Sequence, residues 1–173
     1  MEYILETERL FLRRIESDDA GFILRLLNDP SFIRYIGDKK VRSIEDAENY
    51  ILAGPAASYE RHGFGLWLVG LKETGEPLGM CGLLKREELE DVDIGYAFLP
   101  AFRSMGYAAE AAEGVIGFAR ARLGLGRIVA ITLPGNQSSI RVLEKNGFRF
   151  ERTVKLTDDG DELSLYASNV ARK

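Results

Sequence analysis

The segment between residues 91 and 112 carries the residue types best suited to binding an anion. The alternating run DVDIGYAFL is followed by RSMGYA and then by an alanine-rich stretch. We expect a strand that leads through a glycine-containing loop into a helix, where free backbone N–H groups favour phosphate or pyrophosphate. Gly106 would allow close approach of the anion, and Arg103 would add a charge-assisted contact. A purely structural turn is the alternative, because neither the Walker pattern nor the three-glycine dinucleotide motif is present.

Acidic side chains gather just before this loop. Five of them lie within seven residues, namely Glu87, Glu88, Glu90, Asp91 and Asp93. Such a run usually keeps the end of a hairpin solvated, but it would also attract a cationic substrate towards a nearby cleft.

The rarest residue types limit metal, disulfide and nucleic-acid chemistry. Cys81 is the only cysteine and His62 the only histidine, so an intrachain disulfide, a four-cysteine zinc site and a histidine-pair metal site are excluded. The 23 basic and 27 acidic residues give a net charge of −4, which disfavours a nucleic-acid binder. No apolar run is long enough to span a membrane, and the first residues lack a secretory pattern. We therefore expect no membrane partner and a cytoplasmic location.

The elements that must position these residues can be read from the hydrophobic pattern. With 173 residues, 46% of them hydrophobic, the chain is expected to form one mixed α/β domain over residues 1–173 rather than a disordered or fibrous protein. The pattern predicts strands over 7–15, 64–71, 78–84, 91–99, 127–133, 148–156 and 162–167. It predicts helices over 17–27, ended by Pro30, over 43–59 with an interruption at Gly54–Pro55, over 107–123 and over 136–145.

The strand over 91–99 should separate its residues between two faces. Alternation places Val92, Ile94, Tyr96 and Phe98 on one face. Asp93, Gly95 and Ala97 then share the other face.

Two runs of the sequence resemble a known superfamily. DIGYAFLPAFRSMGYAAEA and, further on, NQSSIRVLEKNGF are similar to the GNAT superfamily of acyl-CoA-dependent N-acyltransferases. With the opening ETERLFLRRI, they resemble its ribosomal-protein N-acetyltransferase (RimJ/RimL-like) branch, over essentially the whole chain. The resemblance implies an α/β (α+β) fold with a mixed, mostly antiparallel sheet of about seven strands flanked by helices. A splayed pair of parallel strands would hold acetyl-CoA, which leaves as CoA, and no metal is implied.

The resemblance also assigns cofactor-binding residues. The family's pyrophosphate loop, Arg/Gln-x-x-Gly-x-Gly/Ala, matches Arg103, Gly106 and Ala108, with Ser104, Met105 and Tyr107 supplying backbone groups. The strand end that pairs with the pantetheine arm corresponds to Ala97, Phe98 and Leu99. The family's Asn-x-x-Ser matches Asn136 and Ser139, which would contact the cofactor arm and its sulfur. A helix N-cap for Asn136 and a first-turn hydroxyl for Ser139 are the alternatives.

Catalytic roles follow from the same resemblance. A backbone N–H near Phe98 would face the thioester carbonyl and stabilise the oxyanion of the tetrahedral intermediate, an interaction typically worth a few kcal/mol of barrier. Many members carry a tyrosine that protonates the leaving thiolate, but the corresponding residue here is Leu143, which cannot donate a proton. We expect Ser139 to replace it. Asp93 is the candidate base, and a water relay in its place is left open. An exposed strand carboxylate is the alternative interpretation of Asp93.

The sequence favours an enzyme that moves acetyl directly to a primary amine. A protein or peptide N-terminus is the leading acceptor, in line with the branch that the sequence resembles. Such an acceptor needs only a water relay or a modest carboxylate, because about a tenth of α-amines are neutral at pH 7 against under about a thousandth of lysine amines. A small amine such as an antibiotic or a polyamine comes second. A non-catalytic acyl-CoA-binding module for regulation or partner recognition is the alternative that Leu143 keeps open. The physiological acyl group and the formation of a homodimer are left open by the sequence.

Overall fold

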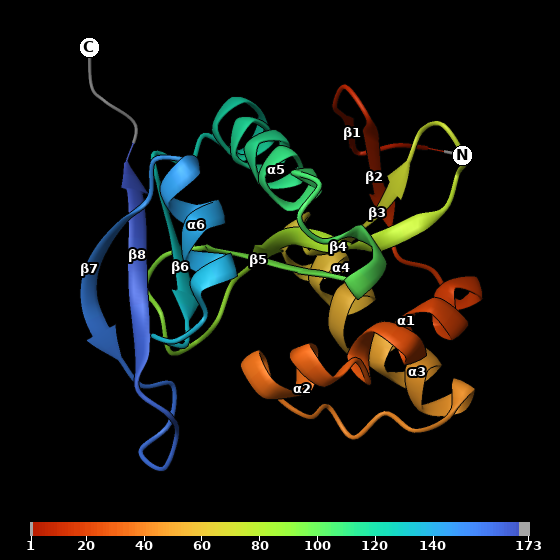
Figure 1. Cartoon of the computed structure of the whole chain (residues 1–173), viewed down its shortest axis with the longest axis horizontal. Helices are drawn as coiled ribbons and strands as arrows, with labels where there is room; N and C mark the ends of the chain where they lie inside the picture. The colour runs from red at the N-terminus through yellow and green to blue at the C-terminus, as the bar shows by residue number, and fades with distance from the viewer. Residues whose placement is uncertain (1, 170–173) are drawn as a thin grey trace.

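An eight-stranded sheet forms the frame of the protein (Figure 1). The computed structural model describes residues 2–169. The strands follow the order β1-β2-β3-β4-β5-β6-β8-β7, and every neighbouring pair is antiparallel except β5 and β6. Their bounds are β1 Leu5–Glu6, β2 Leu10–Arg14, β3 Leu66–Leu71, β4 Pro77–Leu84, β5 Asp93–Phe98, β6 Arg127–Thr132, β7 Arg149–Val154 and β8 Leu163–Asn169. The mixed, mostly antiparallel sheet with one parallel pair is therefore confirmed.

The predicted first strand over 7–15 corresponds to β2, and a short additional strand, β1, which was not predicted, precedes it. β1 and β2 form a tight hairpin in which the backbone N–H of Thr7 donates to the carbonyl of Leu10 at 2.9 Å. The Thr7 hydroxyl in turn accepts from the Leu10 N–H at 3.2 Å. The sheet consequently has eight strands rather than about seven. The other six predicted strands agree with the structure to within two residues at each end.

Helices cover both faces of the sheet (Figure 1). Helices α5 (Tyr107–Leu123) and α6 (Gln137–Lys145) lie on one side, and α1 (Ala20–Leu27), α2 (Pro30–Tyr35), α3 (Ile44–Ile51) and α4 (Ala57–His62) lie on the other. The core under α5 and α6 includes Val115 and Leu143. A second core joins Ile23 to Leu68 and Met80 on the opposite face. The two faces of the sheet beside β5 and β6 are thus covered by different sets of helices.

Pro30 follows the end of one helix and begins the next. Helix α1 ends at Leu27, before the proline, as predicted. Asp29 then caps α2 by accepting a hydrogen bond from the Phe32 N–H at 3.3 Å, and Pro30 occupies the first helical position. That position needs no N–H, so proline is well suited to it. The short helix α2 was not predicted.

The helical region after Ser43 is interrupted where Gly54–Pro55 predicts, but the chain does not leave the helical path. Ser43 caps α3 by accepting from the Asp46 N–H at 3.0 Å. Residues 52–56 then form a π-helical turn that leads directly into α4. The wider turn accommodates Pro55, which lacks the N–H that an α-helix would use.

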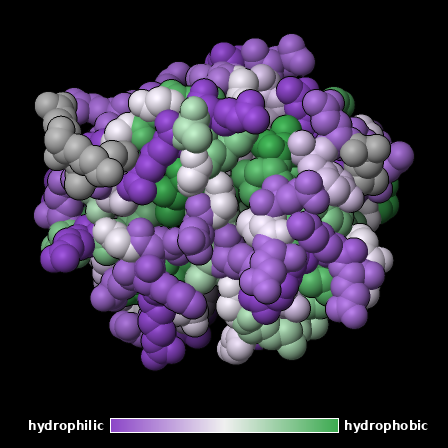
Figure 2. All heavy atoms as spheres, turned by 90° about the horizontal axis from the view of Figure 1, so that it is seen from above, coloured by the Kyte–Doolittle hydropathy of each residue, from purple (hydrophilic) through white to green (hydrophobic). Residues whose placement is uncertain are grey.

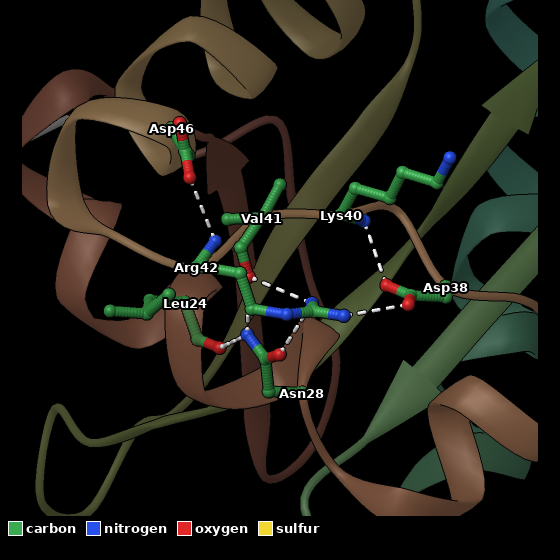
Figure 3. A network of polar contacts seen from close by, with 7 residues as sticks. All are labelled: Leu24, Asn28, Asp38, Lys40, Val41, Arg42 and Asp46. Atoms are coloured by element: carbon green, nitrogen blue, oxygen red, sulfur yellow. Dashed lines mark hydrogen bonds and ion pairs between the residues drawn. The ribbon is translucent and has the colours of Figure 1, made fainter.

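The loop between α2 and α3 is fixed by Arg42 (Figure 3). Its guanidinium donates to Asp38 at 2.6 Å and to the side-chain oxygen of Asn28 at 2.9 Å. Its backbone N–H donates to Asp46 at 2.9 Å, and the Asn28 amide donates to the carbonyl of Val41 at 2.8 Å. The loop is therefore held against both α1 and α3.

The surface seen from above in Figure 2 is mainly hydrophilic. Its apolar residues form patches between charged and polar side chains rather than one continuous area. Within residues 2–169, no helix combines the length and the apolar character needed to cross a bilayer.

Candidate functional site

Strands β5 and β6 pair at one point and then diverge. Their single pairing joins Asp93 to Val129, and the Val129 N–H donates to the carbonyl of Val92 at 3.1 Å. Figure 1 shows β5 running away from β6 beyond that point. The splayed parallel pair that the resemblance implies is thus present, with its opening towards the ends of both strands.

The backbone of Phe98 faces this opening. The Leu99 N–H donates to the carbonyl of Leu78 on β4 at 2.9 Å. Backbone groups of successive strand residues point to opposite sides, so the groups of Phe98 are directed towards β6. No residue of β6 pairs with Phe98. Its N–H therefore lies where the predicted thioester donor belongs, and that role remains a prediction.

The start of α5 presents unused backbone donors. Gly106 precedes the helix in a left-handed conformation with φ 82°, and it provides no side-chain cap. The first bond of the helix runs from the Glu110 N–H to the Gly106 carbonyl at 3.0 Å. The N–H groups of residues 107–109 consequently have no helical acceptor. This end of a 17-residue helix therefore has free backbone donors of the kind that bind pyrophosphate, and their contact with a coenzyme stays a prediction.

The side chain of Arg103 points away from those donors. Its guanidinium donates to Asp29 at 2.7 Å, to the Ser31 hydroxyl at 3.0 Å and to the carbonyl of Phe98 at 2.8 and 3.1 Å. Arg103 thus contributes its backbone to the loop before α5, while its side chain contacts α2 and the end of β5. A direct contact of its charge with a pyrophosphate stays a prediction.

Arg9 lies beside the loop instead, and the sequence did not indicate it. Its guanidinium donates to the Met105 carbonyl at 3.0 Å and to Glu110 at 2.7 Å, and it stacks 4.4 Å above the Tyr107 ring. A side chain at Gly106 would meet the same guanidinium, 3.4 Å away. Since 96 residues separate Arg9 from Met105, no local pattern could have revealed the contact.

Asn136 and Ser139 are brought together at the start of α6. The Asn136 side-chain oxygen accepts from the Ser139 N–H at 3.3 Å, so its helix-capping role is confirmed. The Ser139 hydroxyl lies 3.0 Å from the Tyr96 hydroxyl, which also donates to the Ser139 carbonyl at 2.9 Å. Burial raises the pKa of Tyr96 above its usual range. Leu143 is only 2% exposed and packs in the core, as a leucine there should.

Asp93 occupies the closed end of the opening. It is 1% exposed, so its alternative interpretation as an exposed carboxylate is wrong. Burial raises the pKa of Asp93 to about 6, although the Arg86 guanidinium at 3.2 Å acts in the opposite direction. At about 3.3 Å per residue, Phe98 is about 16 Å further along the strand. The structure therefore does not bring Asp93 into direct contact with the Phe98 N–H.

Two cavities lie on the side of α1 to α4. One, of about 240 Å³, lies between α2 and the ends of β6 and β8; its lining includes Ile33, Ile36, Leu133, Leu156, Asp161 and Leu163. The other, of about 230 Å³, lies between the π-helical turn and Lys85, towards the Asp93 end of β5. Of the two, the cavity beside α2 has lining residues next to the end of β6, where the strands have diverged. Among residues 2–169, no cluster of three or more His, Cys, Asp or Glu side chains could hold a metal ion.

Comparison with known proteins gives consistent matches. The family model described as an acetyltransferase (GNAT) domain matches residues 9–149. The chain is 33% identical over 153 residues to the uncharacterized N-acetyltransferase YoaA of Bacillus subtilis (strain 168), covering 88% of this chain and 86% of that protein. It is 27% identical to a GNAT-family acetyltransferase of Bacillus anthracis of known crystal structure, with a TM-score of 0.79 over 95% of this chain and 97% of that chain.

A more distant structure shares the fold. RimL, the ribosomal L7/L12 α-N-protein acetyltransferase solved in complex with coenzyme A, gives a TM-score of 0.84 over 98% of both chains. The two sequences are 20% identical. The likeness at this level is one of fold.

Proposed function

The chain belongs to the GNAT family and is an acyl-CoA-dependent acetyltransferase, and from this premise we propose that it acetylates the N-terminal α-amine of a protein or peptide. The assignment to the ribosomal-protein N-acetyltransferase branch is part of the proposal. The main support for the proposal is the opening beyond the single β5–β6 pairing, next to the cavity beside α2. The fold shared with RimL is consistent with it.

The chain's own groups would hold the coenzyme at three places. The N–H groups at the start of α5 would bind its pyrophosphate, and the diverging edge of β5 from Ala97 to Leu99 would bind its arm. Asn136 uses its side-chain oxygen to cap α6, which leaves its amide nitrogen as a donor. Acetyl-CoA, once bound, supplies the acetyl thioester.

Phe98 would activate the carbonyl group. Its N–H faces the opening and has no partner on β6. A fixed backbone donor of this kind stabilises negative charge that develops on a carbonyl oxygen, and its loss typically costs about 2.7–4 kcal/mol of barrier.

Ser139 and Tyr96 would serve the departing sulfur. Their hydroxyls are 3.0 Å apart, and Tyr96 is anchored to the Ser139 carbonyl. A phenol with the ordinary pKa of about 10 is already protonated at physiological pH, and burial raises the pKa of Tyr96 further. We propose that Ser139 donates to the sulfur and that Tyr96 orients Ser139. This pair would take the place of the tyrosine that Leu143 replaces.

The acceptor amine would lose its proton towards Asp93 through water. Asp93 and Ala97 lie on the same face of β5, and Gly95 between them has no side chain. A carboxyl group with a pKa near 6 is mostly ionised at pH 7 and can accept a proton. An α-amine needs little help, because its own reference pKa is about 7.7–8.0.

The cavity beside α2 would receive the first residues of the acceptor. Its lining combines aliphatic side chains with Arg34, Tyr35 and Asp161. Asp158, Asp159 and Glu162 flank Asp161 on the same β7–β8 connection. An apolar side chain would pack against Ile33 and Leu163, while the acids would attract the cationic amine during approach.

Release of CoA thiol from acetyl-CoA across a panel of amines tests the proposal. The panel contains peptides with free N-termini, free lysine, polyamines and aminoglycosides, and a thermal-shift assay measures coenzyme binding in parallel. We expect release with the peptides first. Release only with small amines would refute the proposed acceptor. Binding without release from any amine would favour the non-catalytic alternative.

A further inference from the structure

Arg103 joins two elements that form opposite parts of the proposed site. From the loop after β5, its guanidinium reaches back to the Phe98 carbonyl with two N–H groups. The same guanidinium binds Asp29 and Ser31, which begin α2. No other side chain of residues 2–169 makes hydrogen bonds to both α2 and the end of β5.

Helix α2 has few other anchors. It is six residues long, and Phe32 is its only buried residue. Ile33 and Ile36 are 37% and 48% exposed and face the cavity proposed for the acceptor. So little apolar burial cannot by itself fix the direction of a helix of this length. The polar contacts at its first turn therefore matter for where the cavity wall stands.

The contact between Arg103 and Asp29 is built as a fixed junction. The Asp29 side chain is 8% exposed, and the same oxygen accepts from Arg103 at 2.7 Å and from the Phe32 N–H at 3.3 Å. The planar guanidinium can donate to Asp29, the Ser31 hydroxyl and the Phe98 carbonyl at the same time, whereas a lysine ammonium lacks this forked arrangement of donors. Asp29 also neutralises the charge that a pyrophosphate would otherwise meet.

We propose that Arg103 is a positioning residue for the acceptor side of the site. It would hold the wall formed by α2 at a set distance from the end of β5 and keep the Phe98 peptide aligned. Its side chain would then govern use of the acceptor rather than affinity for the coenzyme. The inference rests on the proposed function for the identity of the acceptor, but the junction itself does not depend on it.

Three variants test the proposal. Arg103→Lys keeps the charge, Arg103→Gln removes it, and Asp29→Asn keeps an oxygen to cap α2 while removing the ionic partner. We expect each of the three variants to raise the acceptor KM or lower kcat. In each, kcat/KM for the peptide should fall about tenfold or more. The dissociation constant of CoA, measured by calorimetry, should change less than about threefold.

If the Arg103 guanidinium instead bound the pyrophosphate, the variants would change the affinity for CoA. Arg103→Gln would then weaken CoA binding tenfold or more, Arg103→Lys would largely restore it, and Asp29→Asn would leave it unchanged or improved. That pattern would overturn the proposal. The double variant Arg103→Gln/Asp29→Asn should be no worse than either single variant for the acceptor, because both remove one junction.

A matched control and a readout independent of turnover complete the test. Arg127→Gln removes an arginine that pairs with Asp91 and Glu151 at the far end of β6, and it should change neither the CoA affinity nor the acceptor KM. Hydrogen exchange of the amides of residues 32–36 should accelerate at least threefold in Arg103→Gln. Unchanged exchange would overturn the junction even if no amine is acetylated, whereas faster exchange without turnover would refute only the proposed function.

Discussion

The hydroxyl of Tyr96 on β5 lies 3.0 Å from the hydroxyl of Ser139 on α6 and donates to the Ser139 carbonyl at 2.9 Å. The contact joins β5, one of the two diverging strands, to the start of α6, the helix that follows β6 in the chain. It places a protonated phenol beside the serine expected to serve the leaving sulfur. A tyrosine is thus present at this end of α6, but it comes from the sheet rather than from the helix.

Replacement of Tyr96 by phenylalanine should slow the chemical step. The ring would remain packed while the hydroxyl that orients Ser139 is lost. We expect kcat to fall about 100-fold, at the lower end of the range for a positioned proton-transfer group. CoA affinity should change less than about twofold. Ser139→Ala should give a similar loss, and the double variant should be little worse than either single variant. Full activity in Tyr96→Phe would exclude this role.

Asp93 should control the acid limb of the activity profile. Burial raises the pKa of its carboxyl group to about 6, so the group is increasingly protonated below that pH and cannot accept a proton. The kcat/KM of the wild type should therefore decline below about pH 6. In Asp93→Asn, activity should be low and this limb should disappear. An unchanged limb in the variant would assign it to the substrate amine.

The same pKa predicts a pH-dependent stability. The carboxyl of Asp93 has a higher pKa in the folded chain than the reference of about 3.9 in an unfolded one, so folding favours its protonated form. Its contribution is fully present below about pH 4 and is lost as the pH rises through about 6. Relative to Asp93→Asn, the wild type should lose at most about 3 kcal/mol between pH 4 and pH 7. Urea unfolding at both pH values measures the difference, and equal changes in the two proteins would contradict it.

Glycine at position 79 is required by the close approach of β4 and β5. A Cβ there would lie 2.2 Å from the Ala97 carbonyl oxygen and 2.8 Å from the Phe98 Cα. Gly79→Ala should destabilise the protein by about 1–3 kcal/mol or more and displace the strand end that carries the proposed donor. Gly117→Ala is the control, because nothing lies within 4 Å of its added carbon in α5. It should stabilise by about 0.5–1 kcal/mol. Equal unfolding free energies for the two variants would refute this.

Glu110 should stabilise the protein only while it is ionised. Burial alone would raise the pKa of Glu110, but hydrogen bonds from Thr7 and Arg9 outweigh that effect and lower it. Its stabilisation is therefore present above the unfolded pKa of about 4.3 and is lost as the pH falls further. Glu110→Gln should cost about 1–3 kcal/mol at pH 7 and less at pH 3. Glu113→Gln, an exposed change on the same helix, should have little effect by thermal unfolding.

Local patterns in the sequence predicted the parts of the site that are continuous in the chain. Alternation placed Tyr96 and Phe98 on one face of β5, and the glycine-containing loop predicted the start of α5 at Tyr107, where the structure has it. These features depend on neighbouring residues, whose spacing determines both periodicity and caps. The Asp–Pro pair that begins α2 was also a readable signal, but Pro30 was interpreted only as a helix end.

Contacts between distant residues could not be predicted from one sequence. Arg103 is 74 residues from Asp29, and Tyr96 is 43 residues from Ser139. A family motif identifies Arg103 as part of a loop but does not say which way its side chain points. Its direction is decided by Asp29, a buried acceptor that becomes available only once α2 is in place.

The most direct test uses one peptide that carries both a free N-terminal α-amine and a lysine. The enzyme and acetyl-CoA are incubated with it, and tandem mass spectrometry locates the acetyl group. We predict acetylation of the α-amine, with no acetylation of the same peptide when its N-terminus is blocked. Acetylation of the lysine alone, or equal acetylation of free and blocked peptides, would contradict the proposed function.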